Sequence, residues 1–469
     1  MTGFKHPMHW ATSDRARSHT RAAALAALLL LGFMSASYAQ EPPLSVPRNV
    51  LPARPGDALT AGGWLFYPTI NTYAQYTDNL FHTVLSPISI WGVGVKPSMI
   101  AEWSNGIHKT TLYGNLEVRK YLTDNEFNIF DRQAGFIQNY EALRDLTFKV
   151  QADYSHHTNA STPTAIPGAL ASPGTSTVLP NGNTVLPNGN IISPSGQIVG
   201  QVAPTVNVVG TQTLINPSNV YTGTASVEKI LNRGFIGLTG SLSRTEFDNT
   251  ILSPDITAKT LSGNASFWLG PVFYAYTNGT YASQTSSTNS TAYRVIGGIG
   301  TRQIGLFRAS AYYGHQGSDV QDSGTAGGEV YGGNITYYPT PIWTIGASID
   351  ETVNISNQTT ITNLALNNQA PSALVIPVGA STRITATSLN SSYKISQQWS
   401  VNGTLGYTHV EYIDGPRLDN SWLADVVLQY QMWRNMTLNW EYQYSSIISN
   451  VPLNSSRRNF VSMGATYKF

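Results

Sequence analysis

The chain has no cysteine among its 469 residues, few charged residues and, past residue 39, no long apolar segment. Without cysteine it has neither a disulfide framework nor thiolate ligands for a metal. Asp, Glu, Lys and Arg make up 11% of the residues, whereas soluble globular domains carry about 25%. A helix that spans a membrane needs about 18 or more consecutive apolar residues, which excludes helical spans here. The remaining way to cross lipid is a closed β-barrel, because lipid offers no partners to backbone N–H and C=O groups.

Residues 1–39 have the pattern of a secretory signal peptide. Basic residues come first, at Lys5, Arg15, Arg17 and Arg21. An apolar run over 22–34 follows, and Ser37-Tyr38-Ala39 places small residues at the −3 and −1 positions of a cleavage site. The run is shorter than the about 20 residues of a membrane anchor.

Loss of this segment changes the net charge from +1 to about −2, so no nucleic-acid partner is expected. Residues 40–62 are rich in proline and lack periodicity, and we expect an extended periplasmic lead-in there.

From residue 63 onward the hydrophobic pattern has a period of two. Residues 146–155 read LTFKVQADYS and residues 436–445 read MTLNWEYQYS, with an apolar or aromatic side chain at every second position. This alternation is typical of strands that have lipid on one side and a wet lumen on the other. A soluble β-sandwich would also alternate, but its connections would not follow the pattern described next.

The chain divides into 18 such segments, with 16 as the alternative count. Short connections alternate with long ones throughout, which is the rule for bacterial barrels with periplasmic turns and longer extracellular loops. We therefore predict an all-β, up-and-down antiparallel transmembrane barrel over residues 63–469 with a long loop at 159–217. The expected strands are 63–77, 89–104, 109–121, 128–140, 145–158, 218–230, 233–247, 256–269, 272–284, 290–303, 305–316, 325–338, 342–355, 382–395, 398–412, 419–432, 435–447 and 459–469.

Aromatic residues concentrate near the ends of these strands, as in the aromatic girdles of membrane barrels. The last strand alternates up to Tyr467 and Phe469. It resembles the terminal strand that the barrel assembly machinery recognises, so these two residues are the predicted assembly signal. The last strand is expected to pair with the first, near Trp64–Tyr76.

Residues 63–81 read GWLFYPTINTYAQYTDNLF, and later hairpins join strands through a proline turn followed by Trp, as in YYPTPIW at 337–343. These features resemble the putative β-barrel porin 2 family of alphaproteobacterial outer-membrane proteins. The resemblance implies a barrel in the outer membrane, surrounded by lipid and lipopolysaccharide. Some members of the family are associated with exopolysaccharide systems.

The sequence contains no motif for catalysis, a cofactor or a metal cluster. His156-His157 is interpreted as a polar loop edge rather than a metal or acid–base site. Asp78-Asn79 is interpreted as a turn former rather than a cation site. The chain is therefore expected not to be an enzyme, and a barrel hydrolase is the least favoured hypothesis.

Polar residues of the lumen face carry both charge signs. A barrel of this size encloses an aqueous channel unless something fills it, and a wall without a run of one sign predicts weak ion selectivity. The first hypothesis is a channel for passive diffusion of small polar solutes. The expected lumen-lining residues are Glu117, Arg119, Lys149, Asp153, Arg308, Asp425 and Glu441.

Two long connections are notable for lacking charge. No Asp, Glu, Lys or Arg occurs from Tyr154 to Val227 or from Thr352 to Thr382, and VLPNGN occurs at both 178–183 and 185–190. Pro-Asn-Gly forms turns, so the repeats predict two successive turns. These loops either constrict the lumen or offer a neutral surface to a glycan. The second hypothesis is therefore a structural or interaction role in exopolysaccharide secretion or surface attachment.

Overall fold

The computed structural model describes residues 58–80, 87–122, 128–158, 217–248, 254–286, 289–321, 324–355, 381–413, 415–451 and 455–469, and the backbone of short strands within 161–209 and 360–376. The expected signal peptide and most of the lead-in lie outside these residues. No helix in the described ranges is long and apolar enough to span a membrane.

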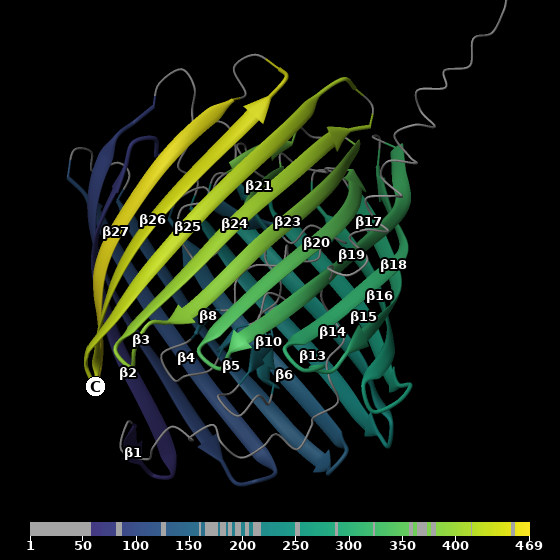
Figure 1. Ribbon diagram of the computed structural model, residues 1–469, viewed down its shortest axis with the longest axis horizontal. Coiled ribbons are helices and arrows are strands. Elements are labelled where there is room, and N and C mark those ends of the chain that lie inside the picture. Colours follow the sequence, from purple (N-terminus) through teal and green to yellow (C-terminus); the bar gives the residue numbers. More distant parts are fainter. Residues whose placement is uncertain are drawn as a thin grey trace, which may run out of the picture.

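Eighteen long antiparallel strands form one closed barrel in which the strands are strongly tilted (Figure 1). Each strand pairs with its neighbours in the chain, so the prediction of 18 strands is confirmed and the alternative of 16 is wrong. The strands are β2 (Trp64–Thr77), β3 (Ile90–Ser104), β4 (His108–Tyr121), β5 (Ile129–Leu143), β6 (Leu146–His157), β13 (Ser218–Leu231), β14 (Gly234–Phe247), β15 (Ile256–Trp268), β16 (Phe273–Thr285), β17 (Asn289–Thr301), β18 (Phe307–Val320), β19 (Gly324–Thr340), β20 (Trp343–Ile355), β23 (Ser381–Lys394), β24 (Trp399–Tyr412), β25 (Leu418–Trp433), β26 (Met436–Ser449) and β27 (Ser456–Lys468).

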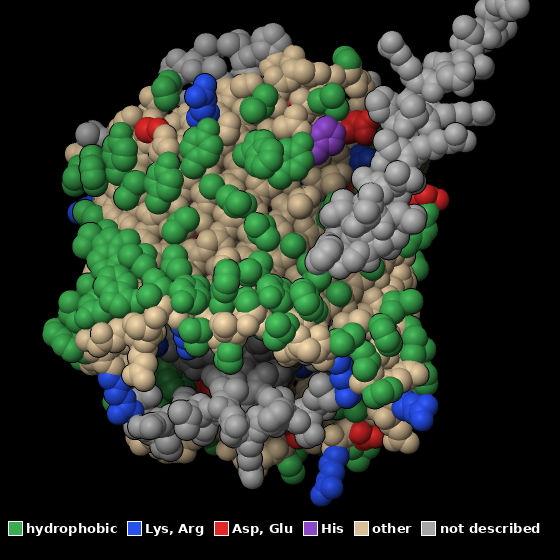
Figure 2. Space-filling view, in the orientation of Figure 1, with side chains coloured by type: hydrophobic (Ala, Val, Ile, Leu, Met, Phe, Trp, Pro, Cys, Tyr) green, Lys and Arg blue, Asp and Glu red, His purple; other side chains and the backbone are tan. Residues whose placement is uncertain are grey.

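The two faces of each strand differ as the alternation predicts. On β6, Phe148 and Val150 are exposed on one face, whereas Gln151 on the opposite face is buried. The exposed apolar face is the lipid-facing surface, and the opposite face lines the lumen. Figure 2 shows hydrophobic side chains in a dense band toward the short-turn end and a second row nearer the long-loop end, with most charged side chains beyond them.

The aromatic residues form the two expected girdles. At the short-turn end, the ring of Trp399 stacks on Tyr430 with centroids 4.5 Å apart and lies 6.0 Å from Trp440. At the long-loop end, Tyr407 packs against Trp422 with centroids 4.5 Å apart. Trp422 therefore belongs to the girdle at the long-loop end.

The barrel closes between β2 and β27. Their register runs from Thr69 opposite Lys468 to Thr77 opposite Phe460, and the amide of Phe469 donates to the carbonyl of Pro68 (3.1 Å). The predicted pairing of the last strand with the first is thus confirmed. The role of Tyr467 and Phe469 as an assembly signal stays a prediction.

A short strand covers the part of β2 that β27 does not reach. β1 (Leu59–Ala61) pairs with β2 from Trp64 to Phe66, so the end of the expected extended lead-in is a strand. Gly62 and Gly63 turn the chain between the two strands with φ angles of 57° and 83°, a conformation that glycine adopts without strain. Together β1 and β27 pair most of the length of the edge of β2.

Asp78 and Asn79 hold the other end of the seam, the line along which β2 pairs with β27. Asp78 accepts hydrogen bonds from the backbone N and the Nδ2 of Asn459 (2.7 and 2.6 Å). Asn79 is buried, and its Nδ2 donates to the carbonyl of Arg457 (3.0 Å). These residues therefore join the two ends of the sheet, a role beyond the turn formation that their residue types predict.

The two uncharged connections contain short strands. Within 159–217 lie β7 (Ser161–Thr164), β8 (Thr177–Val178), β9 (Thr184–Val185), β10 (Asn190–Ile192), β11 (Ile198–Gln201) and β12 (Val206–Val209). The pairing of β8 with β9 and of β9 with β10 is antiparallel, which agrees with two successive turns at the VLPNGN repeats. β21 (Thr360–Asn363) pairs with β22 (Ala373–Ile376) in the second connection and lies beside β12.

Tyrosine rings on the lumen face lie flat over glycines of the neighbouring strand. A Cβ added at Gly332 would lie 2.2 Å from the hydroxyl oxygen of Tyr312, which stands directly opposite it in the register. Only glycine allows the ring this close approach. The same arrangement occurs at Tyr73–Gly94, Tyr113–Gly135, Tyr274–Gly300 and Tyr276–Gly298.

We expect Asp78→Ala to weaken the seam. The change removes two hydrogen bonds to Asn459 and should destabilise the barrel by about 2 kcal/mol. The temperature at which the folded barrel loses its distinct mobility in a detergent gel measures this. Asp319→Ala, an exposed acid on a hairpin away from the seam, is the control, and equal losses in both variants would contradict the role of Asp78.

We expect Gly332→Val to displace the ring of Tyr312 and to destabilise the barrel by about 1–3 kcal/mol, as overpacking generally does. The same gel assay measures the effect. Gly346→Val on β20 is the matched control, because a Cβ there meets its nearest atom, a backbone oxygen, at 3.9 Å. A Gly332 variant as stable as the control would show that the close approach is unimportant.

Candidate functional site

The lumen wall is the surface on which polar and charged side chains of all 18 strands converge. Most inward side chains in the long-loop half of the wall are buried, among them Gln75, Gln284, Gln316 and Gln443. Many in the short-turn half are partly exposed, such as Ser98, Lys149, Asn264 and Asn402. The wall is therefore more open toward the short turns, the periplasmic side by the barrel rule.

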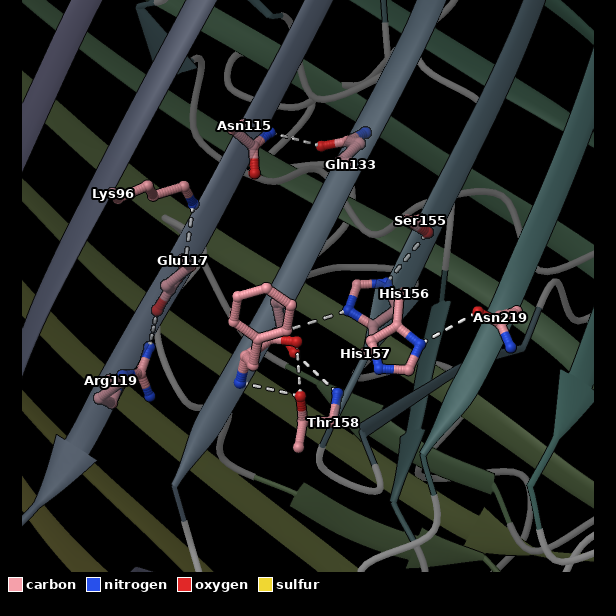
Figure 3. A network of polar contacts seen from close by, with 12 residues as sticks. Lys96, Asn115, Glu117, Arg119, Gln133, Ser155, His156, His157, Thr158 and Asn219 are labelled. Atoms are coloured by element: carbon pink, nitrogen blue, oxygen red, sulfur yellow. Dashed lines mark hydrogen bonds and ion pairs between the residues drawn. The ribbon is translucent and has the colours of Figure 1, made fainter.

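Glu117 and Arg119 of β4 belong to a charged cluster on this wall. They form an ion pair, and Lys96 of β3 lies 3.3 Å from the Oε2 of Glu117 (Figure 3). The hydroxyl of Tyr73 donates to Glu117 (2.6 Å) and accepts from the Nε of Arg119 (2.9 Å). Every charge in this cluster faces an opposite charge or a dipole, which fixes the side chains in place.

A second cluster spans β17, β18 and β20. The guanidinium of Arg294 donates to Tyr312 (2.7 Å) and to Asp350 (3.2 Å), and Tyr312 also donates to Asp350. None of these residues was among the predicted lumen residues. The alternation along each strand does assign Arg294 and Lys96 to the lumen face, because a charge in the middle of a barrel strand is unfavourable on the lipid face.

A third cluster lies at the long-loop ends of β24 and β25. Asp419 is fully buried and accepts from the hydroxyl of Tyr412 (3.0 Å). Arg417 forms an ion pair with Asp419 (2.7 Å), and its guanidinium lies 4.5 Å from the centre of the Tyr412 ring. The three clusters share one composition, an arginine, a tyrosine and a carboxylate, and we call them the Arg–Tyr–carboxylate clusters.

The structure places Lys149, Asp153 and Arg308 on the lumen face but apart from one another. Asp153 accepts from the Nε2 of Gln151 (2.7 Å) on the same strand. Lys149 lies diagonally across from Glu228 of β13, since Glu228 pairs with Thr147. Arg308 lies on β18, away from these two residues, and stands opposite Thr336 of β19.

Asp425 and Glu441, by contrast, are brought close together. Asp425 of β25 stands opposite Gln443 of β26, so Glu441 is its diagonal neighbour. Arg458 of β27 is buried beside them and donates to Gln443 (2.6 Å). The two predicted acids thus share their part of the wall with a base. That these residues line a permeation path stays a prediction.

His156 and His157 point to opposite faces, because they are adjacent on a strand. His156 bonds to Asn219 on the outer surface, and the Nδ1 of His157 lies 3.7 Å from Asp131 on the lumen side (Figure 3). They are therefore not placed to bind one metal ion together. Over the described residues, no three His, Asp or Glu side chains are grouped as a metal site would require.

Two parts of the wall are polar with almost no charge, and the strands β17–β20, which carry Arg294 and Asp350, lie between them. The inward positions of β14, β15, β16 and β24 hold no Asp, Glu, Lys or Arg, and β23 has only Lys394, at its short-turn end. The charged side chains of these strands, such as Arg244 and Lys259, lie on the outer face. Partly exposed hydroxyl and amide groups line both parts, at Thr239, Ser241, Ser262, Asn264 and Asn278 on β14–β16 and at Asn390 and Asn402 on β23 and β24.

Solved structures similar to this chain include outer-membrane receptors and transporters. The siderophore receptor PirA from Acinetobacter baumannii is 8% identical, with a TM-score of 0.44 over 86% of this chain and 80% of that chain. The FrpB iron transporter from Neisseria meningitidis is 9% identical, with a TM-score of 0.42 over 86% and 81% of the two chains. OccK10 (OpdN) from Pseudomonas aeruginosa is 10% identical, with a TM-score of 0.44 over 86% and 99%.

No curated protein matches the sequence. The profile of one family does, and it covers residues 200–469, which is more than half of the chain. The matched region includes the strands from β13 to β27, and with them the seam strand and two of the three Arg–Tyr–carboxylate clusters. The chain is an outer-membrane β-barrel and belongs to the family described as "Putative beta-barrel porin 2".

Proposed function

We propose that the barrel is a channel for passive diffusion of small, polar solutes with little preference for either ionic charge. The observation that carries this proposal is the pairing of opposite charges along the lumen wall. Lys96 lies 3.3 Å from Glu117, Lys109 lies 3.4 Å from Glu102, and Arg119 pairs with Glu117. Paired charges cancel at a distance, so they produce little net field along the path of an ion.

The openness of the wall toward the short turns supports the same function. Polar side chains of the wall that are partly exposed there could contact a solute on the periplasmic side. In the described part of the wall, the tyrosine hydroxyls of the Arg–Tyr–carboxylate clusters bond to the carboxylates of the same clusters, and we assign them a structural role. Family membership agrees with a channel rather than an enzyme.

A second candidate is a role in moving or holding an exopolysaccharide, and the two uncharged parts of the wall favour it. Ser, Thr and Asn side chains can donate to and accept from sugar hydroxyls, and the wall carries no fixed charge over β14–β16 or over most of β23 and β24. A glycan that passes through or rests in the barrel would contact these strands.

We expect purified, folded barrels to give discrete conductance steps in planar bilayers, with a reversal potential near zero in a potassium chloride gradient. Lys96→Gln should shift the potential toward cation preference, because it leaves an acid of the wall less compensated. One unit charge near a passing ion contributes about 1 kcal/mol in water before screening, which corresponds to about a two- to fivefold change in the permeability ratio.

Lys120→Gln is the matched control for this experiment. Lys120 lies on β4 next to Arg119, but its side chain is exposed on the outer face, so the same loss of charge should leave the reversal potential unchanged. A folded barrel that stays electrically silent would contradict the channel. Equal shifts in both variants would show that the lumen pair does not set selectivity.

The glycan role predicts a different phenotype. A strain without this chain should retain less polysaccharide on its surface. A strain that carries the Lys96 variant should retain a normal amount, because the uncharged parts of the wall are intact in it. The amount of cell-surface polysaccharide measures both. Normal polysaccharide export in the deletion strain would remove this candidate while leaving the channel open to the bilayer test.

A further inference from the structure

The outer surface repeats one arrangement at three long-loop hairpins. A Tyr-x-His segment stands on the ascending strand, at Tyr154–His156, Tyr313–His315 and Tyr407–His409. In each hairpin the tyrosine is paired in register with an aromatic residue and the histidine with a polar one. The partners of the three segments are, in the same order, Tyr221 with Asn219, Tyr331 with Glu329, and Trp422 with Asn420.

The hydrogen bonds of the two asparagine hairpins are alike. Asn219 Oδ1 accepts from the hydroxyl of Tyr154 (2.9 Å). It also lies 3.0 Å from the Nδ1 of His156 (Figure 3). Asn420 Oδ1 accepts from Tyr407 (2.7 Å) and lies 2.8 Å from the Nδ1 of His409. An amide oxygen only accepts, so the histidine proton is held on Nδ1. The imidazole Nε2 is thereby directed away from the asparagine.

This arrangement lies at the level of the lipid headgroups. The paired aromatic residues belong to the long-loop girdle, where amphipathic rings mark the interface of the membrane. The His–Asn pair comes two residues closer to the loop, about 7 Å along the strand. Its side chains therefore reach the polar layer of the outer leaflet, where the lipopolysaccharide headgroup carries its phosphates.

The β6–β13 hairpin differs by an arginine directly opposite its histidine, whereas the arginine nearest to His409, Arg383, stands opposite Glu411 and lies 3.9 Å from Glu351. Glu246 of β14, which stands opposite Asn219, is paired with Arg244 (2.9 Å). Arg132 of β5 stands opposite His156 and is exposed on the outer face. Its guanidinium donates to the hydroxyl of Tyr154 (3.1 Å) and lies 5.8 Å from the centre of that ring. In the β18–β19 hairpin an acid, Glu329, takes the place of the asparagine and would repel an anion. We call Arg132, Tyr154, His156 and Asn219 the Arg132 site.

We propose that the Arg132 site binds a phosphate of the lipopolysaccharide headgroup in the outer leaflet. The guanidinium offers paired N–H donors that match phosphate oxygens. The Nε2 of His156 faces away from Asn219 and would offer a further donor in the imidazolium form, and the Nδ2 of Asn219 is an amide donor. Tyr154 holds the guanidinium in place through its hydroxyl and its ring. The site depends on the outer-membrane location of the barrel and not on what passes through the lumen.

The test uses the full barrel in detergent and native mass spectrometry with bisphosphorylated lipid A as the probe. The double variant Arg132→Gln, His156→Gln should bind lipid A at least tenfold more weakly, since it removes the charged donors of the site. Lipid A without phosphates should bind both proteins equally and weakly. Phosphatidylglycerol, a phosphate on a different headgroup, should bind more weakly than lipid A.

Lys229→Gln is the control for general loss of charge. Lys229 pairs with Asp145 at the short-turn end of the same hairpin pair, and its loss should not change lipid A binding. Arg132→Lys keeps the charge without the forked donors and should give an intermediate affinity, which separates recognition from misfolding. Unchanged binding in the double variant, an equal loss in the Lys229 variant, or equal binding of phosphatidylglycerol would overturn the proposal.

Discussion

The need to pair every backbone N–H and C=O group within hydrocarbon governs this molecule. A flat sheet of 18 strands would leave two open edges, and the fold avoids both by joining β2 to β27. Because the strands are tilted and staggered, β27 covers only part of β2. β1 covers the section beyond, and Asp78 and Asn79 tie the opposite end to β27. The seam therefore depends on segments at both ends of the chain that look unimportant in the sequence.

The same constraint shapes the lumen wall. Glycines on the neighbouring strand lack a Cβ, so tyrosine rings can lie flat over them. Their hydroxyls then lie flat against the wall, at the height of the neighbouring arginines and carboxylates. Tyr73 and Tyr312 each bond to both partners in this way. The charges of the wall are consequently held by the sheet, and a passing solute would meet a fixed pattern rather than mobile side chains.

The strands, their faces and the closing pair could be predicted from the sequence, because each rests on a local pattern: alternation, short turns and the apolar last strand. Glu117 and Arg119 could be assigned to the lumen for the same reason. Their contacts with Tyr73 and Lys96 could not be predicted, since which residues of β2, β3 and β4 face one another depends on the register of the sheet. The bonds of Asp78 to Asn459 depend on closure and join residues that no local pattern relates. β1 was missed because a three-residue strand is too short to show a period.

The spacing of the two aromatic girdles determines which membrane thickness matches the barrel. On β24, Trp399 and Tyr407 mark the two interfaces and are eight residues apart. That separation is about 26 Å along the strand and about 20 Å along the membrane normal at a tilt near 40°. A typical bilayer has a hydrocarbon core about 30 Å thick, and the bacterial outer membrane is thinner than average. Hydrophobic mismatch would thus penalise the barrel in a thicker membrane, so thickness alone favours its residence in the outer one.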